Sequence, residues 1–161
     1  MKFIDAVIIY KEILKIVKIL ALDIGDVWVG VAISDAIQMT CRPLTTLKLP
    51  ELEKYLEKIT SEESLEAIVI GYPITMSGTQ SEQTKKVIAK KEELEKFFES
   101  KEEQVKFILW DERLSSKRAW ELKGRAPKTK EEKLKEHSIA ASYILQNYLD
   151  FKSLSSKVEA E

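Results

Sequence analysis

The chain has 161 residues, of which 44% are hydrophobic and 33% are charged, and its formal net charge is −1. This composition is typical of one globular domain with a sizeable core, and it excludes low-complexity and disordered chains. Cys41 is the only cysteine, which excludes an intrachain disulfide and a thiolate zinc cluster and indicates a reducing compartment. Charged residues such as Asp5 and Lys11 interrupt the apolar N-terminal stretch before it reaches the length of a signal peptide or a membrane span. We therefore expect a cytoplasmic protein with no membrane partner.

The hydrophobic pattern divides the chain into three parts. We predict an amphipathic N-terminal extension over residues 1–17, one folded domain over residues 18–150 and a C-terminal tail over residues 151–161. No linker-like tract divides the central part. Because Val17 begins the compact phrase VKILALD, a further hypothesis is that translation starts there, at a codon read as Met.

The predicted elements alternate along the chain. Two apolar runs, at residues 16–22 and 27–33, flank a Gly25-Asp26 turn and predict a β-hairpin, although runs this short also fit a buried helix. Further strands are expected at 43–49, 65–70 and 105–110, and helices at about 51–59, 81–99, 115–124 and 130–150. Thr129 and Glu132 form a capping-box pattern for the last helix. This order predicts an α/β domain with a mixed five-stranded sheet flanked by helices, as in RNase H-like (RuvC-like) proteins.

Three carboxylates stand where strands are predicted to end. Asp23 ends the first strand, and Asp111 and Glu112 follow the fifth. Sites in open α/β sheets form outside such strand ends, so these side chains are expected to converge. Converging carboxylates repel one another unless a cation is bound, and hard oxygen ligands suit Mg²⁺ or Mn²⁺. A simpler alternative is that Asp23 accepts hydrogen bonds from the turn while Asp111 and Glu112 pair with Arg113 or cap a helix.

The sole histidine, His137, falls on the apolar stripe of the last predicted helix. It therefore points inward, either as a satisfied core histidine or as a ligand.

A basic segment precedes that stripe. Between residues 113 and 137 there are nine Lys or Arg against four Glu, which leaves the remainder of the chain acidic. Such a cluster indicates either a phosphate-binding surface or a solvated helix face. The candidate substrate-binding residues within it are Arg113, Lys117, Arg118, Arg125 and Lys128.

Five phrases together resemble the YqgF/RuvX family of RNase H-like nucleases over about residues 18–150. In chain order they are LDIGDVWVGVAISD (22–35), RPLTTL (42–47), IVIGYPITMSGTQSEQ (68–83), WDERLSS (110–116) and HSIAASYILQNYL (137–149). The resemblance is specific because all five occur in the order and spacing of the family. It implies a RuvC-like fold and a nuclease that processes the 5′ end of pre-16S ribosomal RNA in the cytoplasm.

The resemblance also assigns roles to individual residues. Asp23 matches the metal-binding carboxylate of the first strand, and Asp111, Glu112 and Arg113 match the DER motif of the family. Glu112 is then a metal ligand, and Arg113 contacts the scissile phosphate. The loop at residues 71–78 resembles a family segment that flanks the site.

The chain departs from the family in three places. Val27 and Trp28 stand where the family has a lysine and an arginine, and Thr75 stands in place of an asparagine. His137 stands where the last helix of the family supplies an aspartate. A neutral imidazole is a ligand for Mn²⁺ and a general acid or base near neutral pH, so this replacement is compatible with activity.

The resulting hypothesis is metal-assisted phosphodiester hydrolysis with Asp23, Asp111, Glu112 and His137 as catalytic residues. Asp23 and Glu112 would hold one ion that activates water, and Asp23 and His137 a second ion near the leaving oxygen. Arg113 or Lys117 would offset negative charge in the transition state.

Three alternatives stay open. A Holliday junction resolvase would act on branched DNA as a dimer, whereas the expected state here is a monomer or weak dimer. A non-catalytic nucleic-acid-binding module would explain the histidine at the ligand position. Kinases of the actin-like fold share the opening hairpin, but 161 residues do not supply their second lobe.

Overall fold

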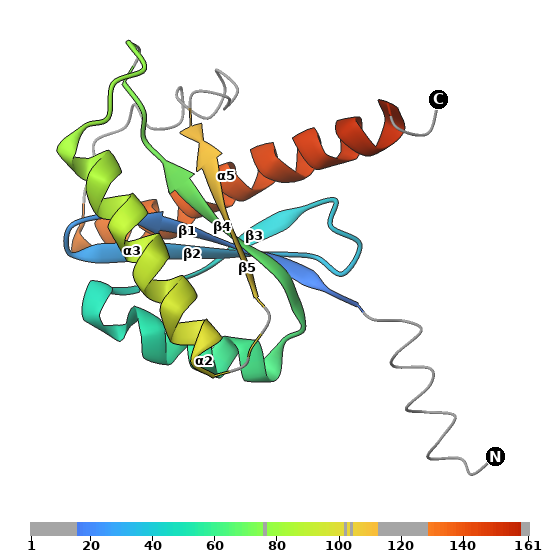
Figure 1. Ribbon diagram of the computed structural model, residues 1–161, viewed down its shortest axis with the longest axis horizontal. Coiled ribbons are helices and arrows are strands. Elements are labelled where there is room, and N and C mark those ends of the chain that lie inside the picture. The colour runs from blue at the N-terminus through green and yellow to red at the C-terminus, as the bar shows by residue number, and fades with distance from the viewer. Residues whose placement is uncertain (1–15, 76, 102, 104, 113–128, 159–161) are drawn as a thin grey trace.

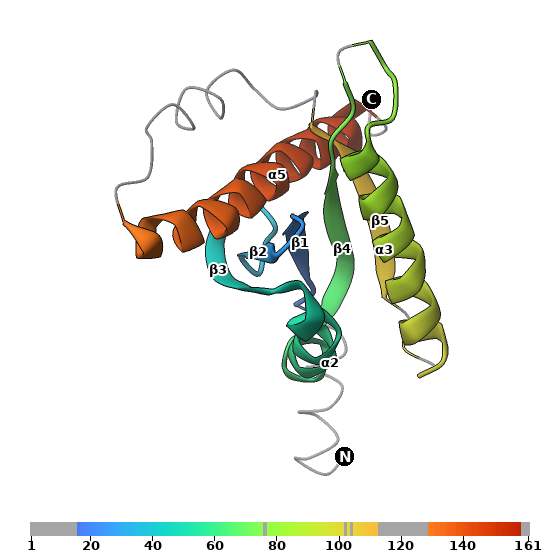
Figure 2. The same cartoon turned by 90° about the vertical axis from the view of Figure 1, so that its left-hand side faces the viewer.

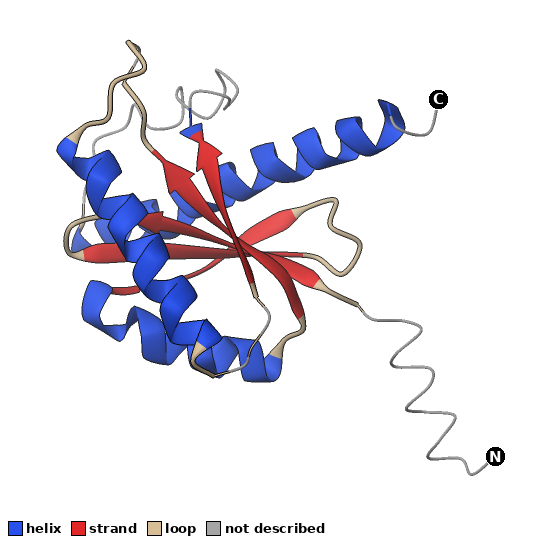
Figure 3. Cartoon of the chain, in the orientation of Figure 1, coloured by secondary structure: helices blue, strands red, loops and turns tan. Residues whose placement is uncertain are grey.

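The computed structural model describes residues 16–75, 77–101, 103, 105–112 and 129–158. Its strands and helices are β1 (Lys18–Ile24), β2 (Trp28–Ser34), β3 (Cys41–Lys48), η1 (Leu49–Glu51), α2 (Leu52–Glu62), β4 (Leu65–Tyr72), α3 (Glu82–Glu99), β5 (Lys106–Asp111) and α5 (Lys130–Val158). The strands form one sheet in the order β3-β2-β1-β4-β5 (Figure 1; Figure 3). The first three strands are antiparallel neighbours, and β4 and β5 extend the sheet in parallel. The predicted mixed sheet is therefore confirmed.

Helices cover both faces of the sheet, and this explains why the central strands are almost continuously apolar (Figure 2). On β1, Leu20 and Leu22 point to the face covered by α2 and α3, whereas Ile19 and Ala21 point to the face covered by α5. We call these the α2–α3 face and the α5 face. None of the described helices is both long enough and apolar enough to cross a membrane.

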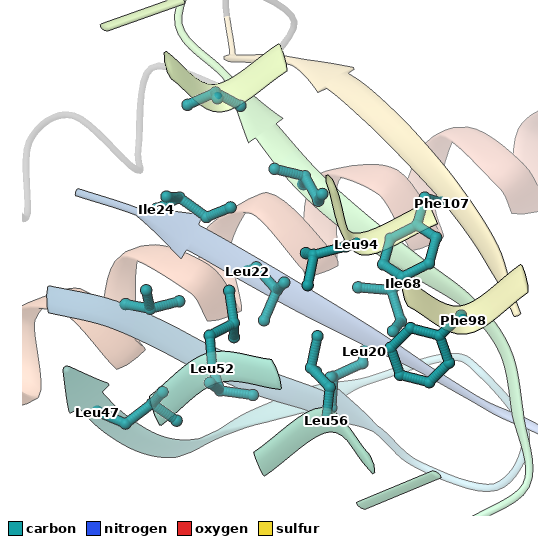
Figure 4. Close-up of a cluster of buried hydrophobic side chains, with 14 of the residues drawn as sticks. Leu20, Leu22, Ile24, Leu47, Leu52, Leu56, Ile68, Leu94, Phe98 and Phe107 are labelled. Carbon is teal, nitrogen blue, oxygen red and sulfur yellow. The ribbon is translucent and has the colours of Figure 1, made fainter. Parts of the chain in front are cut away.

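The larger core fills the α2–α3 face. Leu52 and Leu56 of α2 and Leu94 and Phe98 of α3 are at most 1% exposed and pack against the even-numbered side chains of β1 (Figure 4). Burial of a leucine or phenylalanine side chain contributes about 1.5–3 kcal/mol, so this layer provides much of the stability of the domain.

The smaller core lies under α5, which comes very close to the sheet. Ala21 and Ala32 are fully buried beneath it, and a Cβ built on Gly30 would lie 1.8 Å from the backbone oxygen of His137. Glycine and alanine at these positions allow the helix backbone almost to touch β2. The height of α5 above the sheet is thus set by small residues on the hairpin.

The predicted starts of α2, α3 and α5 are confirmed to within a residue, whereas α2 ends three residues after its predicted end and α5 ends well after its own. Ser81 accepts a hydrogen bond from the Thr84 backbone at 3.1 Å and caps α3. Thr129 and Glu132 form the expected reciprocal cap of α5, with bonds of 3.0 and 3.1 Å. However, α5 does not end near residue 150 and continues to Val158.

The longer helix has a tertiary cause. Phe151 lies just beyond the predicted end, and its ring centroid is 5.2 Å from that of Trp110 on β5. This contact anchors another turn of helix, and residues 151–158 contain no glycine or proline to stop it. The predicted helix at 115–124 and residues 125–128 of the basic segment lie outside the described residues.

We predict that Gly30→Ala destabilises the fold by about 2 kcal/mol or more, because the new methyl group would overlap the backbone of α5, which cannot rotate away. Gly78→Ala is the matched control. Gly78 has a φ of 77° but no neighbour within 4 Å of its built Cβ, so only backbone strain of about 1 kcal/mol is expected. Urea unfolding measures both losses, and equal losses would contradict the close approach of α5.

We also predict that the thiol of Cys41 reacts slowly. Burial raises the pKa of Cys41 to about 11, and its Sγ donates to the carbonyl oxygen of Ser142 at 3.0 Å. Because the thiolate is the reactive form, alkylation by iodoacetamide at pH 8 should be about a hundredfold slower in the native protein than in urea. Similar rates in the two conditions would show that the thiol is accessible and unperturbed.

Candidate active site

The site is built around Asp23, the next-to-last residue of β1. Its backbone pairs with that of Gly30 on β2. Strand alternation puts its side chain on the α5 face with Ile19 and Ala21, and the side chain is 28% exposed. Asp23 is thus a partly buried carboxylate on the α5 face, near the end of a central strand.

His137 reaches this carboxylate from α5. The helix backbone at His137 rests on Gly30, and the imidazole Nδ1 lies 3.9 Å from Asp23 Oδ2. The imidazole side chain is 34% exposed, so it lies at the border between the core and solvent. The inward direction predicted from the apolar stripe of α5 therefore brings His137 to Asp23.

The electrostatics of this pair follow from its geometry. The Asp23 carboxylate raises the pKa of His137 above its ordinary value, and Glu136 adds a smaller effect in the same direction. Partial burial opposes the shift without cancelling it. In the metal-free protein the imidazole is consequently biased toward its charged form.

Glu112 approaches the same face from β5. A Cβ on Gly71 of β4 would lie 2.7 Å from Glu112 Oε1 and 2.5 Å from Ile144 Cδ1 of α5. The carboxylate therefore occupies space above β4 that is open only because residue 71 has no side chain. Leu22 of β1 pairs with Ile70 of the parallel strand β4. Asp23 and Gly71 are therefore the next residues along these two neighbouring strands.

Asp111 has a different position. It is the last residue of β5 and pairs with Tyr72. Trp110 packs in the core under α5, so alternation along the strand directs Asp111 to the α2–α3 face. The structure brings Glu112 to the face that carries Asp23 and His137, and it does not bring Asp111 there.

The loop after β4 borders the site through local hydrogen bonds. The hydroxyl of the buried Thr84 donates to the carbonyl oxygen of Pro73, and Gln83 Nε2 donates to the carbonyl oxygen of Ile24 at 2.8 Å. Thr75 donates to the carbonyl oxygen of Thr79 at 2.9 Å and thereby closes the loop on itself. The residue in place of the family asparagine therefore stabilises the loop.

A small pocket adjoins His137 on the side toward the start of α5. It has a volume of about 190 Å³ and is lined by Trp28, Lys130, Lys133, Leu134 and His137. We call it the Trp28 pocket. In the sequence, Trp28 stands out only as a residue in place of a cation, and neither lysine is among the predicted substrate-binding residues, although both lie in the basic segment.

The remaining predicted substrate-binding residues are not placed. Arg113, Lys117, Arg118, Arg125 and Lys128 lie outside the described residues, so their roles stay predictions.

The donor set fits a hard divalent cation in its chemistry. Asp23 and Glu112 offer carboxylate oxygens on one face, and Gly71 leaves the space in which Glu112 lies. Within the part of the chain that the structure describes, no three His, Cys, Asp or Glu side chains form a complete ligand cluster. His137 Nδ1 is directed toward Asp23 and would have to be unprotonated to act as a ligand.

The sheet order and the carboxylate on its central strand define the RNase H-like class of fold. The RuvC protein of T. thermophilus, solved in complex with a Holliday junction substrate, has this fold with a TM-score of 0.55 and 9% sequence identity. The similarity covers 86% of this chain and 96% of that chain.

The chain belongs to the RuvX family, described as Holliday junction resolvase, whose sequence model matches residues 17–151. A protein of Caldicellulosiruptor bescii is 38% identical over 136 residues, and one of Clostridium tetani is 38% identical over 138 residues. Each alignment covers 83% of this chain and 96% of the relative. Both relatives carry the name "Putative pre-16S rRNA nuclease".

Family membership confirms the predicted enzyme class. RuvX is a nuclease family, so the chain is a hydrolase that acts on phosphodiester bonds of nucleic acid. Nucleases of the RuvC and RNase H-like type generally use divalent metal ions.

We predict that the metal-free protein shows a His137 pKa above the ordinary value of 6.5, and that Asp23→Asn lowers it by removing the stabilising charge. Because the folded pKa is raised, the pair stabilises the fold fully below the unfolded pKa, and this stabilisation is lost as the pH rises through the folded pKa. His137 is the sole histidine, so an NMR titration reports it directly. Equal midpoints in the two proteins would show that the residues are not coupled.

Proposed function

We propose that this chain is a metal-dependent endonuclease that processes the 5′ end of pre-16S rRNA in the cytoplasm, with Asp23, Glu112 and His137 at its active centre. The observation that carries the proposal is the approach of His137 to Asp23 at 3.9 Å, on the face over which Glu112 lies. Asp23 is the next-to-last residue of β1, His137 lies on α5 and Glu112 directly follows β5, so the fold brings residues that are distant in sequence to one face of the sheet. The basic residues of the 113–128 segment are proposed to complete the site, whereas Asp111, which alternation along β5 directs to the α2–α3 face, is left out of it.

Each residue has a role that follows from its chemistry. The carboxylates of Asp23 and Glu112 concentrate negative charge on the partly exposed α5 face of the sheet. This charge attracts cations and repels a substrate phosphate that has no cation bound to it. Where no ion is bound to it, the imidazole of His137 holds a proton beside Asp23 and is placed to exchange it with the reacting oxygens. Arg113 and Lys117 are proposed to contact phosphate.

Asp23 and Glu112, together with the unprotonated imidazole of His137, would hold Mg²⁺ or Mn²⁺. When bound, such an ion lowers the pKa of a coordinated water and offsets charge on the phosphate. Carboxylate oxygens suit either ion, whereas imidazole favours Mn²⁺ over Mg²⁺.

The RNA substrate is proposed from the printed name of the relatives, "Putative pre-16S rRNA nuclease". The second candidate is a Holliday junction, which the description of the family favours. Symmetric cleavage of a junction requires a dimer, whereas a monomer or weak dimer suffices for a single cut in RNA.

Asp23→Asn should abolish metal-dependent cleavage of a 5′-extended 16S precursor, or of a four-way junction assayed separately, while the fold is retained. Asp26→Asn is the matched control. Asp26 lies on the same hairpin turn, but it is exposed and pairs with Lys86 of α3 at 2.7 Å. Cleavage assays with Mg²⁺ or Mn²⁺ and circular dichroism of both variants form the test, and cleavage by Asp23→Asn at the wild-type rate would refute the proposed site.

Metal binding can be tested without an activity assay. Paramagnetic Mn²⁺ should broaden the His137 imidazole resonances at low metal-to-protein ratios, and Asp23→Asn or Glu112→Gln should weaken this effect at least tenfold. Asp26→Asn again serves as the control. Broadening that is unchanged in all three variants would place the ion elsewhere.

A further inference from the structure

We propose that the Trp28 pocket binds an unpaired nucleobase of the substrate strand next to the cleavage site, with the adjoining phosphates on Lys130 and Lys133. The proposal deepens the proposed function and depends on it for the class of substrate. It assigns this enzyme a preference for single-stranded nucleic acid at that position.

Trp28 is placed for this role by the register of the hairpin. Asp23 pairs with Gly30, and Trp28 lies two residues before Gly30 on β2. Residues two apart on a strand share a face, so the indole lies on the α5 face with Asp23, and the Cα atoms of two residues in this diagonal relation are usually about 7–8 Å apart. Its place among the residues that line the pocket agrees with this orientation.

The other wall of the pocket is a turn of α5 that carries positive charge. Lys133 and Leu134 precede His137 by about one helical turn, and Lys130 precedes Lys133 by nearly another. Both lysines are exposed, and the Nζ of Lys48 lies 6.0 Å from the centre of the Trp28 ring. The carboxylate of Glu132 on the same turn is bonded to the backbone of Thr129, so it is directed to the helix start.

An aromatic ring beside cations is the combination that binds single strands. The indole supplies a flat surface on which any base can stack, and lysines contact the backbone phosphates. The pocket volume of about 190 Å³ equals several water molecules of about 30 Å³ each, which leaves room for one flat base. The bases of a duplex have their faces covered by neighbours, so only an unstacked base can use this surface.

The pocket is continuous with the active centre because His137 belongs to both. A strand whose reacting phosphate lies at Asp23 and His137 therefore meets Trp28 and Lys133 with an adjacent nucleotide.

The test compares Trp28→Leu with Trp28→Phe in the catalytically silent Asp23→Asn background. Binding of a labelled 12-nucleotide single-stranded RNA and of a 12-base-pair RNA duplex is measured by fluorescence anisotropy in chelator. Stacking on an aromatic side chain is worth about 1–3 kcal/mol, so Trp28→Leu should weaken single-strand binding by about tenfold or more, and Trp28→Phe should retain most of it. Duplex binding should change less than about twofold in both variants. Thermal melts verify that both variants are folded.

The lysines are tested by salt dependence. Lys133→Ala should weaken binding. It should also lower the magnitude of the slope of log affinity against log salt concentration by about one, the amount expected for one lost phosphate contact. Lys58→Ala is the matched control, because Lys58 is exposed on α2 at the other face of the sheet. Loss of affinity in the control to the same extent would show a non-specific charge effect and overturn the assignment.

Failure of this inference differs from failure of the proposed function. Equal single-strand binding by Trp28→Leu and Trp28→Phe, or equal losses for single strand and duplex, would overturn the role of Trp28 even if Asp23→Asn abolishes cleavage. Persistent cleavage by Asp23→Asn would refute the nuclease site and leave the binding result standing.

Discussion

The contact between the backbone of α5 and Gly30 is the constraint on which the rest of the site depends. A side chain at that position would overlap the carbonyl oxygen of His137, so glycine sets the height of the helix above the hairpin. At that height the imidazole reaches Asp23, the buried alanines are covered, and the start of α5 forms a wall of the Trp28 pocket. The position of the active centre is thus a consequence of main-chain packing.

A second glycine performs the same function at the other end of the site. Gly71 leaves space above β4 that the carboxylate of Glu112 and the side chain of Ile144 both approach. The two glycines lie on strands that flank β1, and α5 crosses above both. Functional groups from β5 and α5 are therefore brought toward Asp23 by the absence of side chains between them.

Sequence patterns predicted the sheet and its helix starts because these depend on local rules. Alternation, β-branched runs and a turn define the hairpin, and capping residues define where α3 and α5 begin. The end of α5 was not predictable, since it depends on the contact of Phe151 with Trp110 of β5, which is distant in sequence. Likewise, whether Asp111 or Glu112 lies on the α5 face depends on the register of β5, because a shift of one residue would exchange the faces of the two side chains. The Trp28 pocket needed the placement of α5, because its two walls are far apart in sequence.

The packing of His137 has a consequence for how this family can vary. Its main chain is held by the glycine of the hairpin, and its imidazole is partly exposed at the border of the core. The side chain therefore contributes little to the support of the helix, and an aspartate or a histidine fits at this position without moving the scaffold. Such a position is free to change its charge and its metal preference in one mutational step, so catalytic chemistry in this fold can evolve while its architecture stays constant.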